Sequence, residues 1–177
     1  YIILNIFYTL YFKKIFLIDL VFLSIFFTLR VYIGTIPPEI DLSLWLLSFA
    51  FFVFLTLACL KRYSQIIFAI SNNENILIGR NYSSKNLNLL SFLIFTLSIV
   101  SVFIFYYYLS TDNILKIYKP DFILYSLPII FVSWILLLYK DAKKNKIKDD
   151  PVSYAISDYK SIFLGGIFTI ILILSTK

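Results

Sequence analysis

The sequence predicts an all-α integral membrane protein, a single polytopic bundle of transmembrane helices over residues 1–177. Hydrophobic residues make up 60% of the chain and charged residues only 15%, which lies far from the composition of a soluble domain. Long apolar runs recur along the chain at lengths close to that of a bilayer-spanning helix. Basic residues are concentrated in alternate connections between these runs, as in multi-pass proteins.

Six apolar segments are expected, at residues 1–12, 15–36, 44–60, 87–109, 122–139 and 162–175. About five of them are long enough, or nearly so, to cross a bilayer core, whereas 1–12 has the length of a truncated span. The runs are continuously apolar and do not alternate, which favours helices over barrel strands. Pro128 predicts a kink in the fifth segment, and Gly165 and Gly166 predict close helix packing in the sixth.

The connections between these segments differ in charge. The second contains Glu39 and Asp41 and no basic residue, and the fourth balances two lysines against two aspartates. The first, third and fifth are basic, with Lys13, Lys14, Lys61, Arg62, Arg80, Lys85, Lys140, Lys143, Lys144, Lys146, Lys148 and Lys160. The positive-inside rule therefore predicts that these three face the cytoplasm and that the C-terminus lies outside.

Several classes of site are excluded by composition. The chain has no histidine and a single cysteine, Cys59, so neither a disulfide framework nor a usual zinc site can form. Any metal must be bound by oxygen ligands, which favours magnesium. No Ser/His/Asp set, phosphate-binding glycine loop or redox pair is evident. In the last connection, Asp150 followed by Pro151 predicts a helix start with an aspartate N-cap.

Two ionisable residues, Asp19 and Arg30, lie within the apolar segment 15–36. Such groups cost several kcal/mol each at membrane depth unless they meet partners or water, so both are candidate site residues. Eleven residues return to nearly the same helix face, roughly 16 Å along the axis. This face is expected to line something polar. Two alternatives stay open: snorkelling of Arg30 to the outer surface, and a structural pairing of Asp19 with Lys13, Lys14 or a neighbouring helix.

A second group of candidates follows the third segment, in the sequence LKRYSQI. Lys61 and Arg62 emerge at the expected cytoplasmic interface, and Gln65 lies one helical turn after Lys61. A lysine and an arginine there could clamp a phosphate or diphosphate. The alternative is that they bind lipid headgroups as ordinary stop-transfer charges. Asp158, at the entrance to the last segment, is either a site residue or a partner of Lys160.

The chain resembles the decaprenyl-phosphate phosphoribosyltransferase branch of the UbiA prenyltransferase superfamily. The stretches that carry the resemblance are YFKKIFLIDLVFLSIFFTLRVYIG, SLWLLSFAFFVFLTLACLKRYSQI, NYSSKNLNLL and DPVSYAISD. The resemblance implies a fold of nine helices around a cavity that opens to lipid and to the cytoplasm. The six segments here would match the fourth to ninth, the C-terminal two thirds of such a transferase. The location implied is the bacterial inner membrane.

This resemblance also implies an activity: transfer of the 5-phosphoribosyl group of phosphoribosyl diphosphate to a polyprenyl phosphate. Magnesium would assist, held in part by an NDxxD-type motif upstream of Tyr1. The branch reads KRYxE at the second motif, whereas this chain reads KRYSQ, so Gln65 retains a hydrogen-bonding role without the acidic charge.

The site residues implied by the resemblance form three groups. Asp19, Arg30, Lys61 and Arg62 are the catalytic candidates. Lys14, Lys61, Arg62, Tyr63, Gln65 and Tyr82 are the substrate-binding candidates. Asp158 is the metal candidate. The partners would be the two substrates and the bilayer, not nucleic acid.

Two other functions stay open. One is a UbiA-type enzyme that uses a prenyl diphosphate donor, for which a second acidic motif would be expected. The other is a noncatalytic or transport protein whose buried charges line a permeation path.

Overall fold

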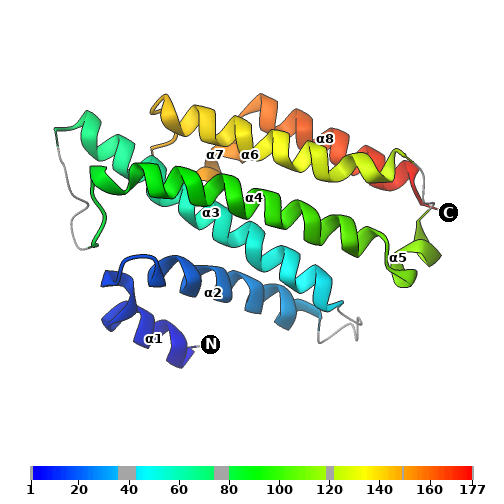
Figure 1. Ribbon diagram of the computed structural model, residues 1–177, viewed down its shortest axis with the longest axis horizontal. Helices are drawn as coiled ribbons and strands as arrows, with labels where there is room; N and C mark the ends of the chain where they lie inside the picture. The colour runs from blue at the N-terminus through cyan, green and yellow to red at the C-terminus, as the bar shows by residue number, and fades with distance from the viewer. Residues whose placement is uncertain (1, 36–42, 74–79, 119–121, 149, 177) are drawn as a thin grey trace.

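Apolar helices run back and forth along the long axis of the molecule (Figure 1). The computed structural model describes residues 2–35, 43–73, 80–118, 122–148 and 150–176. The long helices of this part are α2 (Ile18–Thr35), α3 (Leu44–Ser71), α4 (Leu87–Leu109), α6 (Leu127–Lys143) and α8 (Tyr159–Leu174). The shorter ones are α1 (Ile2–Leu10), η1 (Phe12–Lys14), η2 (Ser84–Asn86), α5 (Asp112–Ile117), η3 (Leu124–Ser126) and α7 (Pro151–Ser157).

Four helical stretches are long and apolar enough to cross a membrane: α2, α3, η2 with α4, and η3 with α6. A fifth results if α7 and α8, which meet at a bend of 83°, are counted as one span. Helix α1 has 9 residues, roughly 14 Å of helix, and is too short to span. The prediction of a multi-pass helical membrane protein with about five spans is therefore confirmed.

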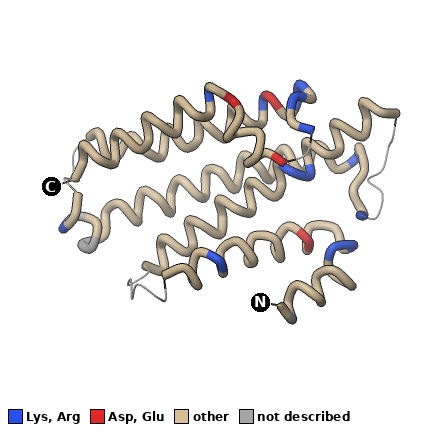
Figure 2. The backbone as a smooth tube through the Cα atoms, turned by 180° about the vertical axis from the view of Figure 1, so that it is seen from behind, with Lys and Arg blue, Asp and Glu red and all other residues tan. Residues whose placement is uncertain are grey.

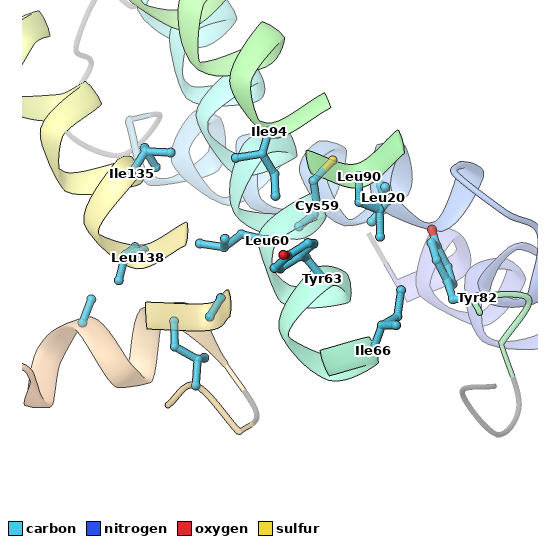
Figure 3. Close-up of a cluster of buried hydrophobic side chains, with 14 of the residues drawn as sticks. Leu20, Cys59, Leu60, Tyr63, Ile66, Tyr82, Leu90, Ile94, Ile135 and Leu138 are labelled. Atoms are coloured by element: carbon cyan, nitrogen blue, oxygen red, sulfur yellow. The ribbon is translucent and has the colours of Figure 1, made fainter. Parts of the chain in front are cut away.

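Helix α3 lies at the centre of the bundle (Figure 1). It packs against α2 on one side and α4 on the other, while α6 contacts both α3 and α4, and α8 packs on α6. Figure 3 shows the buried core where these helices meet: Leu20, Cys59, Leu60, Tyr63, Ile66, Tyr82, Leu90, Ile94, Ile135 and Leu138. A second buried cluster includes Phe105, Leu109 and Leu127.

Most of the described lysines and arginines gather at one end of the bundle (Figure 2). We call this the basic end. It contains η1, the segment from residue 80 to η2, and the connection between α6 and α7, so the three basic connections share one end as expected. Glu39 and Asp41 of the second connection, and Lys119 and Asp121 of the fourth, lie outside the described residues.

Helix α3 is longer than expected. The prediction ended this segment at Leu60, but the helix continues to Ser71, so the KRYSQ sequence lies within it. The continuation has a physical reason: Ile66 and Ala69 are buried beyond KRYSQ, and no glycine or proline interrupts the helix. The expected boundary of this segment at Leu60 was therefore wrong.

Two expectations about helix breakers were also wrong. Pro128 lies in the first turn of α6. Backbone N–H groups in the first turn make no hydrogen bond within the helix, so a proline there costs none and begins the helix instead of kinking it. A Cβ added at Gly165 or Gly166 would meet no atom within 4 Å. These glycines therefore do not permit a close helix contact within the described residues.

Two aspartates begin the last two helices. Asp150 caps α7 by accepting from the Ser153 amide at 3.1 Å, with Pro151 at the first helical position, as predicted. Asp158 caps α8 by accepting from the Ser161 amide at 3.0 Å. Because Asp158 also ends α7, it lies at the bend between the two helices.

The cap at Asp158 predicts a difference between two substitutions. We expect Asp158→Ala to destabilise the protein by about 1 kcal/mol, because the Ser161 amide in the first turn of α8 loses its acceptor. Asp158→Asn retains an N-capping oxygen and is expected to stay within a few tenths of a kcal/mol of the parent. Thermal unfolding in detergent measures both. Equal destabilisation by the two variants would contradict a capping role and favour a role that needs the charge.

Candidate functional site

The most buried charged group in the described chain is Asp19, whose side chain is 0% exposed at the start of α2. Its Oδ2 accepts from Arg62 Nε at 2.9 Å and lies 3.5 Å from Arg80 Nη1. Its Oδ1 accepts a hydrogen bond from the Tyr82 hydroxyl. Together with Gln65, these residues form what we call the Asp19 cluster. It joins α2, α3 and the segment that precedes η2.

Tyr82 links this cluster to the backbone before α2. Its hydroxyl accepts from the Leu17 amide at 3.2 Å while it donates to Asp19. Burial, followed by the hydrogen bond to Asp19, raises the pKa of the Tyr82 hydroxyl, so it remains the donor. Leu17 has φ +64°, a left-handed conformation unfavourable for a leucine. The hydrogen bond that the Leu17 amide donates to Tyr82 helps to hold the chain in this conformation as it enters α2.

Arg62 points inward and is only 1% exposed. Its Nη1 donates to Gln65 Oε1 at 2.6 Å, one turn further along α3, while its Nε binds Asp19. Lys61 and Arg62 were expected to clamp a phosphate together. In the structure they have different partners, because Arg62 is bound within the Asp19 cluster. Adjacent residues on a helix point about 100° apart, and only Lys61 is left partly exposed.

Lys61 instead binds Asp150 at 2.9 Å, with side chains 37% and 32% exposed. Burial would raise the pKa of Asp150, but hydrogen bonds from Lys61 and from the Ser153 amide lower it below its ordinary value. The pair borders a cavity of about 280 Å³ lined by Leu23, Phe27, Phe54, Leu57, Ala58, Pro151 and Val152. A cation therefore lies at the edge of an apolar cavity.

The remaining predicted residues lie apart from the Asp19 cluster. Arg30 is exposed, with its guanidinium 5.2 Å from the Phe27 ring centre, and is roughly 16 Å along α2 from Asp19. The partners that bury Asp19 all lie at the basic end. Lys14 is exposed in η1. Tyr63 is buried in the core, where its ring centre lies 5.1 Å from that of Tyr139.

The described residues do not by themselves fit the expected magnesium site. They contain no group of three or more His, Cys, Asp or Glu side chains that could hold a metal. The described carboxylates at the basic end are already engaged: Asp19 in its cluster, Asp150 with Lys61, and Asp158 as a helix cap. Asp141 accepts from Tyr154 at 3.2 Å and pairs with Lys146 at 3.3 Å.

Two partners were missed by the sequence interpretation. Arg80 was counted only as a loop charge, and Asp150 only as a helix cap. Their partners are distant in the chain, at Asp19 and Lys61, and no periodic pattern connects such positions. The sequence YxxKNL gives no sign that Tyr82 turns towards α2.

Fold and site together define a multi-pass helical membrane protein with a buried, ion-paired cluster at its basic end. The chain is similar to an uncharacterized protein, y4nM, of Sinorhizobium fredii, with 26% identity over 168 residues and 94% of the chain covered. It is also similar to the nodulation protein NoeC of Azorhizobium caulinodans, with 20% identity over 162 residues and 92% covered. The chain spans 33% and 53% of the lengths of these two relatives. No protein-family model and no solved structure matches it.

The Tyr82 hydroxyl should matter for stability. We expect Tyr82→Phe to cost about 1–3 kcal/mol, because it leaves a buried Asp19 oxygen and the Leu17 amide without a partner. Tyr159→Phe is the matched control, since Tyr159 is 73% exposed. Thermal unfolding of both variants in detergent compares them. A Tyr82→Phe variant as stable as the control would show that the cluster does not depend on this hydroxyl.

Proposed function

We propose that this chain contributes to a membrane transferase that moves the 5-phosphoribosyl group of phosphoribosyl diphosphate onto a polyprenyl phosphate. One observation carries the proposal: three stretches on which the sequence resemblance rests meet in the Asp19 cluster. They supply Asp19 from α2, Arg62 and Gln65 from α3, and Tyr82 from the segment before η2. A shared sequence pattern that forms one buried cluster supports a shared site.

In this proposal Lys61 binds the phosphate of the lipid acceptor. It is the partly exposed cation at the mouth of an apolar cavity, an arrangement suited to a molecule with an anionic head and an apolar tail. Val152 of α7 lines this cavity and also a larger one of about 570 Å³ between α6, α7 and α8. The polyprenyl chain would pass Val152 into the larger cavity.

The reaction would be a substitution at the anomeric carbon of ribose. An oxygen of the lipid phosphate forms the new bond to that carbon, while the bond to diphosphate breaks and its electrons leave with the diphosphate. Asp19, Arg62 and Tyr82 position the helices around the site. The resemblance implies magnesium for this chemistry, but because the described carboxylates are engaged elsewhere, we assign it no residue and no step.

The basic end would face the cytoplasm of a bacterial inner membrane, where phosphoribosyl diphosphate is dissolved. The positive-inside rule supports this orientation, since the described basic residues of three connections share that end (Figure 2). The described chain ends at the opposite end of the bundle, which would lie outside (Figure 1).

Transferase activity can be tested in membranes that contain the protein, with labelled phosphoribosyl diphosphate, polyprenyl phosphate and magnesium. We expect a labelled lipid product. Lys61→Ala should lower its rate at least tenfold, because the acceptor phosphate loses a charged partner, whereas Lys61→Arg should retain part of the rate. Lys160→Ala is the control, since Lys160 is another exposed basic residue, in the first turn of α8.

The same assay distinguishes the alternatives. An unchanged rate in Lys61→Ala would contradict the assigned role of Lys61. Transfer from a prenyl diphosphate instead of phosphoribosyl diphosphate would identify the other type of UbiA enzyme. No product from either donor would favour a noncatalytic or transport function.

The larger cavity allows a test of the path of the lipid chain. Gly165 lines this cavity, Gly166 does not, and a Cβ at either would meet no atom within 4 Å. Gly165→Leu should therefore fill the cavity and raise the KM for polyprenyl phosphate severalfold, while Gly166→Leu should not. The KM for phosphoribosyl diphosphate should stay the same in both variants. Equal effects of the two substitutions would contradict this path.

A further inference from the structure

We infer that Arg80 is an anion-binding residue for a phosphate or diphosphate group, and that the amide at Gln65 strengthens this binding by leaving the Asp19 cluster with one excess positive charge. The inference rests on the proposed function only for the kind of anion. The cluster itself is defined by its contacts. Arg80 was not among the residues that the sequence interpretation assigned to a site.

The charges of the cluster do not balance within the part of the chain that the structure describes. Arg62 and Arg80 both approach Oδ2 of Asp19, at 2.9 and 3.5 Å. No other described carboxylate joins them, because the ion pairs and caps of Asp141, Asp150 and Asp158 lie elsewhere. Two guanidinium groups therefore share one carboxylate, and an excess charge in a buried site attracts an anion.

The two arginines are not equivalent. Arg62 is enclosed, with hydrogen bonds to Asp19 and Gln65 and 1% exposure. Arg80 is 31% exposed, and its buried Nη1 makes no hydrogen bond, since 3.5 Å to Asp19 is an ion-pair distance only. A guanidinium with donors still to satisfy, at the edge of a positively charged cluster, suits the paired oxygens of a phosphate.

Gln65 determines the excess charge. Its Oε1 accepts from Arg62 Nη1 at 2.6 Å, a bond that a glutamate at the same position could also accept. A glutamate would add a negative charge and make the cluster neutral, with two arginines against two carboxylates. The amide keeps the hydrogen bond without that charge. Gln65→Glu therefore changes the charge of the cluster with little change of shape.

The experiment measures binding of inorganic diphosphate, without metal, to the full protein in phosphatidylcholine nanodiscs by titration calorimetry. Four variants form matched pairs. Arg80→Gln and Lys85→Gln each remove one positive charge, and Lys85 is exposed in η2. Gln65→Glu and Asn88→Asp each convert an amide to an acid, and Asn88 is exposed in the first turn of α4. Thermal unfolding without diphosphate confirms that each variant is folded.

We expect Arg80→Gln and Gln65→Glu each to weaken diphosphate binding at least tenfold, and the two controls to change it less than threefold. Gln65→Glu should also raise the unfolding temperature without diphosphate, because it neutralises the cluster. Loss of binding from an unfolded variant is thereby excluded. Competition by added phosphatidylglycerol would identify a lipid headgroup as the source of the anion instead of a soluble diphosphate.

Three results would overturn the inference: no diphosphate binding by the parent protein, unchanged binding in both cluster variants, or equal weakening in the controls. Failure of the proposed function is distinguishable from these. If diphosphate binds through Arg80 but no phosphoribosyl lipid forms, the anion site stands and the transferase proposal fails. If the lipid forms at the parent rate in Arg80→Gln and Gln65→Glu, the transferase proposal stands and the role of Arg80 fails.

Discussion

The ion pair between Asp19 and Arg62 is the interaction on which the basic end of the bundle depends. Both side chains are almost fully buried, at 0% and 1% exposure, so neither charge can be stabilised by water if the other is removed. Breaking a buried pair in this way typically costs about 3–5 kcal/mol. The pair fixes α2 against α3, and Tyr82 extends the same network to the segment before α4. Two helices and the segment that leads into α4 thus take their relative positions from one carboxylate.

The continuity of α3 gives the two adjacent cations of KRYSQ separate roles. Because the helix does not end at Leu60, Lys61 and Arg62 are held about 100° apart around its axis. Arg62 enters the Asp19 cluster, and Lys61 faces α7 and the apolar cavity. Had the helix ended at Leu60, both side chains would have been loop charges with no fixed direction. A short sequence motif therefore contributes to a structural contact and to a candidate ligand contact.

Much of the fold could be predicted from the sequence, and much of the site could not. Hydropathy over about 20 residues determines where helices can span, so the bundle and its basic end followed from composition. The aspartate and proline at the start of α7 act locally and were also predictable. The approach of Arg80 and Tyr82 to Asp19 was not, because it joins positions more than 60 residues apart. The end of α3 was predicted too early because the four polar residues of KRYSQ have the composition of a membrane–water interface. The sequence alone does not show that some of them are buried inside the bundle.

The two carboxylate oxygens of Asp150 have different partners, and this shows how a ligand could bind Lys61 without disturbing the fold. Oδ1 accepts from Lys61, whereas Oδ2 accepts from the Ser153 amide and caps α7. An anion that replaced Oδ1 on Lys61 would leave the cap of α7 intact. The Asp19 cluster would also be unaffected, since Lys61 takes no part in it. The structure therefore separates the contact that a ligand would exchange from the contacts that hold the helices together, which a binding site within a marginally stable protein requires.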